Sequence, residues 1–295
     1  MKKTLIVVLI IVLVIHIFLE LVFRHIVPYA MVQPGISPSL IGKEEMDDNF
    51  QSFTVAANDS IQLSGFMIAP ENDIARSAII LLHGIGGNKS HFYETAQILA
   101  AEGHLAVATD LRAHGESGGK FISYGYYERH DIVAVVDYIK AKYPDIKIGI
   151  WGGSLGGAIA LQAMEIDDRI DFGIVESTFR DLEEIMHDYQ RRIVRLPLGY
   201  YTDKAIRKAE QLANFQVSDV APGKSAANIQ QPVLMAHGDA DVHISFEYGR
   251  AIYDQLPNAQ KQWILVEGGE HHGMAAIGGK AYTDQLFAFI ERHSQ

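Results

Sequence analysis

Short runs of aliphatic residues alternate with helix-like stretches through most of the chain, and this alternation restricts the fold more than any other feature. Six runs have the character of buried strands: SAIILLHG, LAVATD, IKIGIWGGS, DFGIVES, QPVLMAHGDAD and KQWILVEGG. Upstream of them, QSFTVAANDSIQLSGFMIAP predicts a hairpin that turns at Asn58-Asp59-Ser60. Strands that alternate with helices predict an α/β fold, with a mostly parallel central sheet of about eight strands and helices on both faces.

One interval, from Thr178 to Gln230, interrupts the alternation. It shows helical patterning in DLEEIMHDYQRRIVRLP and YYTDKAIRKAEQLANF and has no run that suits a strand. We therefore expect a helical cap insertion at about residues 178–230, with an excursion over the surface as the alternative. Its apolar and aromatic residues suit either an acyl chain or packing against the sheet: Met186, Tyr189, Ile193, Leu196, Leu198, Tyr200 and Tyr201.

The amino terminus carries a long apolar run. Two lysines precede about 19 mostly apolar residues from Leu5 to Phe23. As a helix this run would measure about 28 Å, close to the thickness of a bilayer core. No A-x-A sequence follows it, so an uncleaved signal anchor, or transmembrane helix, is favoured over a cleaved signal peptide. His16 and Glu20 within the run count against a membrane span, and a core helix is the third interpretation.

Charges on either side of the run predict its orientation. Lys2 and Lys3 precede it, whereas Arg24 and His25 are followed by the acidic sequence EEMDD. Because positive residues tend to remain in the cytoplasm, we expect a single-pass cell-membrane protein with its catalytic domain on the extracytoplasmic side. The expected segments are an anchor at residues 1–27, a linker without apolar periodicity at 28–48 and one folded domain at 49–295.

Composition excludes several classes of function. The formal net charge is −11, and Lys and Arg form no long block that could bind nucleic acid phosphate. The chain has no cysteine, which rules out disulfides, a thiol nucleophile and a cysteine-based zinc site. There are 13 histidines but no H-E-x-x-H sequence, and we expect no catalytic metal.

The sequence GIWGGSLGGAIA places Ser154 between a strand-like run and a helix-like run, with Gly152 and Gly156 on either side. On so tight a turn a serine crowds its neighbours against the backbone, so glycine is needed at both flanks. The hydroxyl would project beyond the carboxyl end of the sheet, where open parallel sheets bind ligands. G-x-S-x-G alone is a weak signal, and a flexible loop between two packed elements is the alternative.

Residues able to activate such a serine follow later strands. Asp239 and Asp241 come after QPVLMAHG, and His271 and His272 come after KQWILVEGG. A nucleophilic serine needs a base, and the base needs an orienting acid. The chain order of Ser, Asp and His is typical of a nucleophile-elbow hydrolase. Spacing alone does not separate the two members of either pair.

Four blocks resemble the α/β-hydrolase superfamily, in particular its serine esterase, monoacylglycerol lipase and serine aminopeptidase-like group. They are LLHGIGGNKSHF, ATDLRAHGESGG, GIWGGSLGGAIAL and VLMAHGDADVHIS followed by EGGEHHG, and the resemblance covers about residues 50–293. It implies that the acid is Asp241, in the pattern H-G-x-x-D, and that the base is His271. It also implies an oxyanion hole formed by the backbone N–H groups of Ile85 and Leu155.

The resemblance also implies supporting roles for other polar residues in these blocks. His83 is expected to hold the oxyanion loop rather than act as a base. In the family Asp110, Arg112 and His114 would brace the rim of the site, but ordinary loop hydrogen bonding is the preferred interpretation for each of them.

These features predict a membrane-anchored serine hydrolase that cleaves acyl esters or lipid-like esters through an acyl-enzyme, without a cofactor. In this mechanism Ser154 attacks, His271 accepts its proton and Asp241 orients His271. A serine aminopeptidase, an amidase or a thioesterase of the same fold remains open, as does a non-catalytic membrane-tethered binding protein. A peptidase would need an acidic group to receive a free amino terminus, for which the candidates are Glu176, Glu183 and Glu184. The sequence indicates neither the natural substrate and its acyl-chain length nor the oligomeric state.

Overall fold

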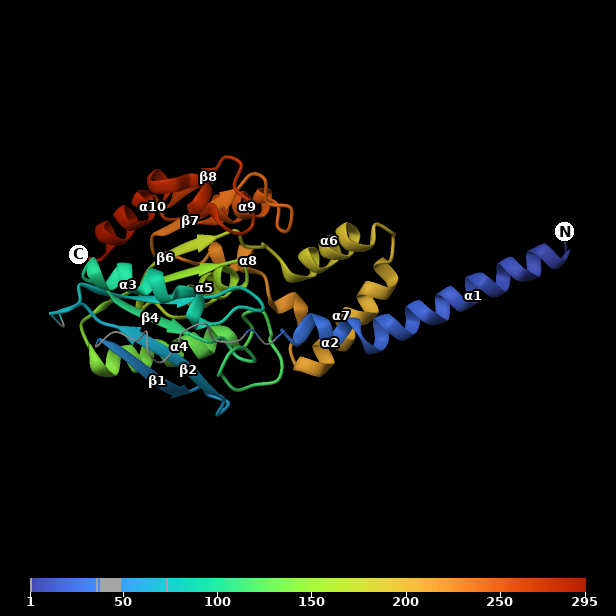
Figure 1. The fold of residues 1–295 in the computed structure, drawn as a ribbon, viewed down its shortest axis with the longest axis horizontal. Coiled ribbons are helices and arrows are strands. Elements are labelled where there is room, and N and C mark those ends of the chain that lie inside the picture. Colours follow the sequence, from blue (N-terminus) through green and yellow to red (C-terminus); the bar gives the residue numbers. More distant parts are fainter. Residues whose placement is uncertain (1, 36, 38–48, 73) are drawn as a thin grey trace.

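The computed structural model describes residues 2–35, 37, 49–72 and 74–295, and its centre is an eight-stranded sheet (Figure 1). The strand order is β1-β2-β4-β3-β5-β6-β7-β8; β2 runs antiparallel to both of its neighbours, and all other pairs are parallel. The predicted sheet is therefore confirmed, including its opening hairpin. The strands are β1 (Phe50–Ala56), β2 (Gln62–Ile68), β3 (Ser77–Leu82), β4 (Leu105–Thr109), β5 (Lys147–Gly153), β6 (Ile170–Glu176), β7 (Val233–Gly238) and β8 (Gln262–Val266).

Helices cover both faces of the sheet because alternate strand residues point to opposite sides. In β3, Ile79 and Leu81 pack in the core that α3 and α10 complete, while Ile80 and Leu82 pack in the core completed by α4, α5, α8 and α9. The helices, with one short 3₁₀ turn, are η2 (Lys89–Phe92), α3 (Tyr93–Ala101), α4 (Glu128–Lys142), α5 (Leu155–Ile166), α8 (Pro222–Ala226), α9 (Phe246–Gln255) and α10 (Met274–His293).

Between β6 and β7 the chain leaves the sheet and forms the predicted helical cap. Its main helices are α6 (Leu182–Val194) and α7 (Gly199–Ala213), followed by η3 (Val217–Asp219). Their apolar sides form a separate core with Phe179 and with Ile244 from the loop after β7. Figure 1 shows α6 and α7 between the sheet and the amino-terminal helix. The side chain of Ile193 lies outside the described residues.

The amino-terminal run forms one helix, α1 (Lys2–His25), that is long and apolar enough to cross a membrane. Its carboxyl-terminal turns pack against the cap, where Phe23 meets Ala205 of α7 and Leu198, the residue before α7. A short helix, α2 (Val27–Val32), follows and also packs against α7. The first residues of the expected linker are thus helical, because Pro28 in the first turn of α2 suits a helix start. Most of the linker, residues 38–48, lies outside the described residues.

Candidate active site

Ser154 lies at the turn from β5 to α5 in a backbone conformation that residues other than glycine rarely adopt, with φ of 54° and ψ of −118°. Such a conformation costs on the order of 1–3 kcal/mol and is typical of functional sites. The turn is fixed from the neighbouring strand. Ser154 N–H donates to the carbonyl of Glu176 (2.8 Å), and the Thr178 hydroxyl donates to the carbonyl of Ser154 (2.8 Å). The serine is therefore held on a rigid turn rather than on a flexible loop.

At the two glycines that flank Ser154, the turn has no space for a side chain larger than a hydrogen atom. A Cβ built on Gly152 would lie 2.4 Å from the carbonyl of Gly156. A Cβ built on Gly156 would lie 2.1 Å from the carbonyl oxygen of Leu82. Backbone atoms cannot rotate away from such contacts as side chains can. Close packing of α5 against β3 and β5 thus explains the requirement for glycine at both positions.

His271 and Asp241 continue a line of hydrogen bonds that starts at Ser154. Nε2 of His271 lies 3.1 Å from Oγ of Ser154, and its Nδ1 lies 2.7 Å from Oδ2 of Asp241. Because a carboxylate can only accept, Nδ1 carries the proton and Nε2 is left to accept from the serine hydroxyl. The three residues come from loops at the carboxyl ends of β5, β7 and β8. Parallel strands bring these ends to one edge of the sheet.

The loop after β7 surrounds the Asp241 carboxylate with donors. Oδ1 accepts from the N–H groups of His243 and Ile244, both at 2.8 Å, and Oδ2 lies 3.3 Å from Nε2 of His237. Burial works to raise the pKa of Asp241, but hydrogen bonds from two histidines and the loop backbone outweigh it, and the pKa falls below its usual range. The carboxylate is therefore ionised at neutral pH and can stabilise a positive charge on His271.

Asp239 and His272 lie outside this line of hydrogen bonds. Asp239 is exposed, and its carboxylate accepts from the N–H of Gly268 (2.7 Å), which ties the β7 loop to the β8 loop. His272 is also exposed, and its ring centroid lies 4.7 Å from that of His271. Of the two pairs that spacing could not separate, the structure joins Asp241 and His271 to Ser154.

The loop after β3 lies against the serine. A Cβ built on Gly84 would be 3.5 Å from Cβ of Ser154. Ile85 follows Gly84 directly, and Leu155 is the first residue of α5. Among the described residues, neither of their backbone N–H groups has a hydrogen-bond acceptor. Both groups are thus available to a ligand beside Ser154.

Buried imidazoles hold this loop in place. His83 donates from Nδ1 to the carbonyl of Gly84 (2.8 Å) and accepts at Nε2 from the N–H of Leu111 (3.1 Å). Burial lowers the pKa of His83 to about 4, so the ring is neutral. His114 accepts at Nε2 from the N–H of Gly86 (3.2 Å), and burial lowers its pKa as well. Both rings stabilise the backbone of the oxyanion loop and are not placed to act as bases.

Asp110 and Arg112 are engaged in buried ion pairs. Asp110 accepts from both the backbone N–H and the ammonium of Lys89, each at 2.7 Å. Arg112 donates twice to Asp131, at 2.7 and 2.6 Å, and once to Asp59 at 3.0 Å. These contacts tie the loop after β4 to η2, α4 and the β1–β2 turn. They are hydrogen bonds between neighbouring loops and helices, and they leave neither side chain for a substrate.

Glu176 was a candidate to receive the free amino terminus of a peptide, but its position does not suit that role. Glu176 is half-buried, and its carboxylate accepts from Nε1–H of Trp151 (2.5 Å) and from the hydroxyl of Tyr282. Burial raises the pKa of Glu176. The group is therefore not available to receive an amino terminus. No local pattern could have indicated this, because Tyr282 is 106 residues away in the chain.

His237 is a residue of the site that sequence reasoning gave no role beside the acid. It is fully buried, and its Nε2 lies 3.0 Å from the carbonyl of Ile244 and 3.3 Å from Asp241. It thus supports the loop that surrounds the carboxylate. Its only sequence signal is its position in H-G-x-x-D.

Within the described residues, no three His, Asp or Glu side chains converge as a metal ion would require. A hollow of about 1140 Å³, lined by residues such as Asn49, Ile68 and Leu105, lies at the amino end of β4, away from Ser154. The arrangement around Ser154 suits acyl transfer: a hydroxyl, a base that can accept its proton, an orienting carboxylate and two unpaired N–H groups.

Comparison with known proteins places the chain among hydrolases. A profile of the prolyl oligopeptidase family matches residues 90–295, more than two thirds of the chain. Bacillus subtilis YqkD is 27% identical over 243 residues, which cover 81% of this chain and 79% of YqkD. The lysophosphatidylserine lipase ABHD12 of Macaca fascicularis is 27% identical, over 61% of this chain and 45% of the lipase. The Bacillus subtilis peptidase YuxL is 24% identical, over 72% of this chain and 33% of YuxL.

Solved structures share the fold. The Pyrococcus furiosus esterase Pf2001 has a TM-score of 0.73 at 22% identity, covering 90% of this chain and 99% of the esterase. The Pyrococcus horikoshii acylaminoacyl peptidase has a TM-score of 0.64 at 21% identity, covering 85% of this chain and 42% of the peptidase. At these identities the likeness establishes the architecture, which esterases and peptidases have in common.

Proposed function

The chain belongs to the prolyl oligopeptidase family within the α/β-hydrolase superfamily, and we propose that it is a membrane-anchored serine hydrolase that cleaves carboxylic esters. The observation that carries this proposal is the continuous line from Ser154 through His271 to Asp241, with distances of 3.1 and 2.7 Å. Each atom in that line has the donor or acceptor character that its role requires.

In the proposed reaction Ser154 Oγ attacks the ester carbonyl while Nε2 of His271 accepts its proton. Asp241 keeps Nδ1 of His271 protonated and stabilises the imidazolium. The same imidazolium then donates its proton to the leaving alcohol, which departs and leaves an acyl group on Ser154. Water, deprotonated by His271, hydrolyses this acyl-enzyme and restores the serine.

The proposed oxyanion hole consists of the N–H groups of Ile85 and Leu155. The negative charge on the carbonyl oxygen develops only in the tetrahedral intermediate, so donors fixed in advance stabilise that state over the substrate. Removing one such donor typically costs 10²–10³-fold in turnover. The bracing of the loop by His83 and His114 supports this role, because a mobile donor would lose much of its effect.

We prefer an ester over a peptide substrate because two of the three acidic candidates are engaged. Glu176 accepts from Trp151 and Tyr282, and Glu184 is paired with Arg180 at 2.7 Å, so neither is free to bind the ammonium of a peptide amino terminus. Glu183, exposed in the first turn of α6 and paired with no described residue, is the acidic group that a peptidase would use. The names of the lysophosphatidylserine lipase and of the Pyrococcus esterase agree with ester cleavage. The family itself and the acylaminoacyl peptidase favour amide cleavage as the second candidate, and a thioester substrate would need the same machinery.

We further propose that α1 anchors the chain in the cell membrane at residues 1–27, with the hydrolase domain at 49–295 on the extracytoplasmic side and its cap at about 178–230. The length and composition of α1 support the span, and Lys2 and Lys3 before it support the orientation. Protease added to intact cells should then remove the domain and leave α1 protected.

The decisive experiment measures hydrolysis of p-nitrophenyl esters from acetate to palmitate by the full chain in detergent, beside aminoacyl p-nitroanilides and an acyl thioester. We expect ester hydrolysis, and we expect Ser154→Ala to lower it by a factor on the order of 10⁴ or more. Ser52→Ala, which alters an exposed serine of β1, is the matched control and should keep the wild-type rate. Wild-type turnover by Ser154→Ala would disprove the assignment. Faster cleavage of the anilides than of the esters would favour the peptidase.

A further inference from the structure

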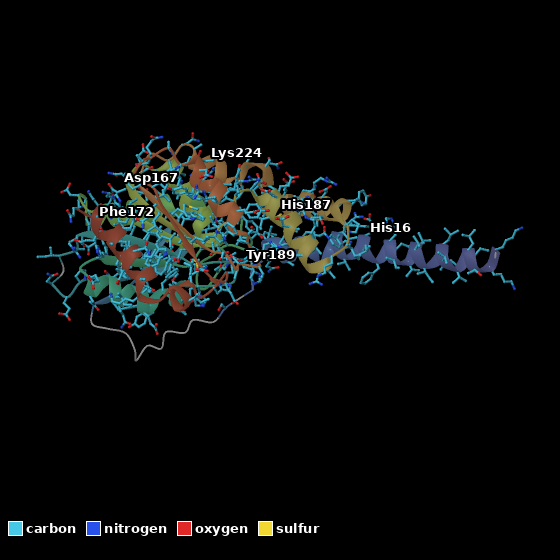
Figure 2. All side chains as sticks on the ribbon, turned by 90° about the horizontal axis from the view of Figure 1, so that it is seen from above. His16, Asp167, Phe172, His187, Tyr189 and Lys224 are labelled. Atoms are coloured by element: carbon cyan, nitrogen blue, oxygen red, sulfur yellow. The ribbon has the colours of Figure 1, made fainter. Side chains whose placement is uncertain are left out.

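The polar residues of the apolar run are paired with the cap. Nδ1 of His16 lies 2.6 Å from the Tyr201 hydroxyl, and the Lys204 ammonium donates to the Glu20 carboxylate at 2.6 Å. His16 and Glu20 are four residues apart and so share one face of α1, the face toward α7. Figure 2 shows His16 on α1 next to the cap, on which His187 of α6 is also labelled. Polar groups within a membrane span face protein and find partners there, which is the arrangement of these two side chains.

These contacts fix the depth at which the cap meets α1. His16 lies seven positions before Phe23, the last residue of the apolar run, a distance of about 10 Å along a helix. The part of the run before His16, Leu5 to Ile15, measures only about 16 Å and cannot by itself cross a bilayer core of about 30 Å. A membrane that α1 spans must therefore extend past His16 toward Phe23. The start of α7, which contacts His16, then lies within the bilayer boundary.

The side chains at this end of the cap suit a membrane interface. Leu196 and Tyr200 are 57% and 59% exposed. Arg195 and the residues Arg191 and Arg192 of the last turn of α6 are exposed as well. Aromatic and aliphatic side chains flanked by arginines are characteristic of surfaces that lie among lipid headgroups.

We propose that the turn between α6 and α7, residues 195–201, is a membrane-binding surface inserted in the leaflet that holds the carboxyl-terminal end of α1. The occupant of this surface is the phospholipid bilayer that α1 crosses. Continuity with α1 carries the inference, because His16 and Glu20 hold Tyr201 and Lys204, at the start of α7, against the span. The proposal rests on the membrane anchoring proposed above and is independent of the reaction at Ser154.

Single-cysteine variants of the full chain test this directly, because the chain contains no cysteine of its own. Leu196→Cys and Tyr200→Cys are labelled with an environment-sensitive nitrobenzoxadiazole and reconstituted in vesicles of phosphatidylcholine and phosphatidylglycerol. Leu13→Cys, within the span, is the positive control. Ile98→Cys is the matched negative control, since Ile98 is 51% exposed on α3 of the body. Circular dichroism establishes that each labelled variant is folded.

We expect blue-shifted emission, and loss of fluorescence when doxyl-labelled lipids are included, for labels at 196, 200 and 13 but not at 98. Labels at 196 and 200 that behave like the label at 98, while the label at 13 is quenched, would overturn the proposal and leave the anchoring intact. An unquenched label at 13 would overturn both the anchoring and the membrane-binding surface. Ester hydrolysis by the unlabelled chain is measured separately, so its failure would bear on the reaction alone.

Discussion

Replacing Asp241 by asparagine tests how the acid acts, because the loop around it determines how the new amide must lie. Oδ1 of Asp241 accepts from two backbone N–H groups at 2.8 Å, those of His243 and Ile244. An asparagine must present its oxygen to these two donors, since turning its NH₂ toward them would bring donor against donor. The NH₂ group then replaces Oδ2 and faces Nδ1 of His271.

This arrangement forces the wrong tautomer on His271. Nδ1 would have to accept from the asparagine, so the proton moves to Nε2, which then cannot accept from Ser154. A change of this kind in a Ser-His-Asp site lowers turnover by about 10⁴-fold, equivalent to about 5 kcal/mol in the barrier. Folding should change little, because both backbone donors keep their acceptor, and Nε2 of His237, which loses Oδ2, still has the carbonyl of Ile244 at 3.0 Å.

The assay is p-nitrophenyl acetate hydrolysis at neutral pH, with urea unfolding measured on the same preparations. Asp239→Asn is the matched control, since Asp239 is exposed and an asparagine oxygen can still accept from the N–H of Gly268. We expect Asp239→Asn to stay within a few-fold of wild type. Asp241→Asn turnover within tenfold of wild type, or equal losses in both variants, would refute the reasoning.

Three further predictions follow from particular contacts. Gly156→Ala should lower the free energy of unfolding in urea by about 3 kcal/mol, because its Cβ meets the Leu82 carbonyl, whereas Gly153→Ala, with no atom nearer than 4.0 Å, should be tolerated. The pKa of His83 is lowered to about 4 in the folded chain, against about 6.5 in the unfolded chain. The neutral ring therefore contributes fully to the free energy of unfolding above pH 6.5, and up to about 3 kcal/mol of this contribution is lost as the pH falls to 4. In urea unfolding, His83→Gln should show a shallower loss over that range, and an equal slope would contradict this. Leu196→Glu should lower the ratio of hydrolysis of a long-chain ester in vesicles to that of p-nitrophenyl acetate, whereas Ile98→Glu should leave this ratio unchanged.

The parts of the molecule that sequence predicted are those governed by local rules. Periodicity separates buried strands from helices, so the eight-stranded sheet and the cap could be anticipated, and steric crowding at a tight turn made the glycines around Ser154 informative. The choice between Asp239 and Asp241, in contrast, does not follow from local rules. Both are aspartates in one loop, and the difference lies in which carboxylate the N–H groups of His243 and Ile244 surround. That is a property of the folded loop and of the position of β8, which spacing along the chain does not contain.

The partners of His16 and Glu20 also could not be predicted from spacing along the chain. In the sequence His16 and Glu20 weaken the apolar run, because a lone polar side chain in lipid is costly. In the structure neither side chain is alone, because Tyr201 and Lys204 pair with them across more than 180 residues of chain. With α1 as the proposed anchor, a cap held to it by these pairs cannot move freely relative to the membrane. The same contacts that would make the span tolerable would then bring the cap to the bilayer surface, where an ester with an acyl chain would be concentrated.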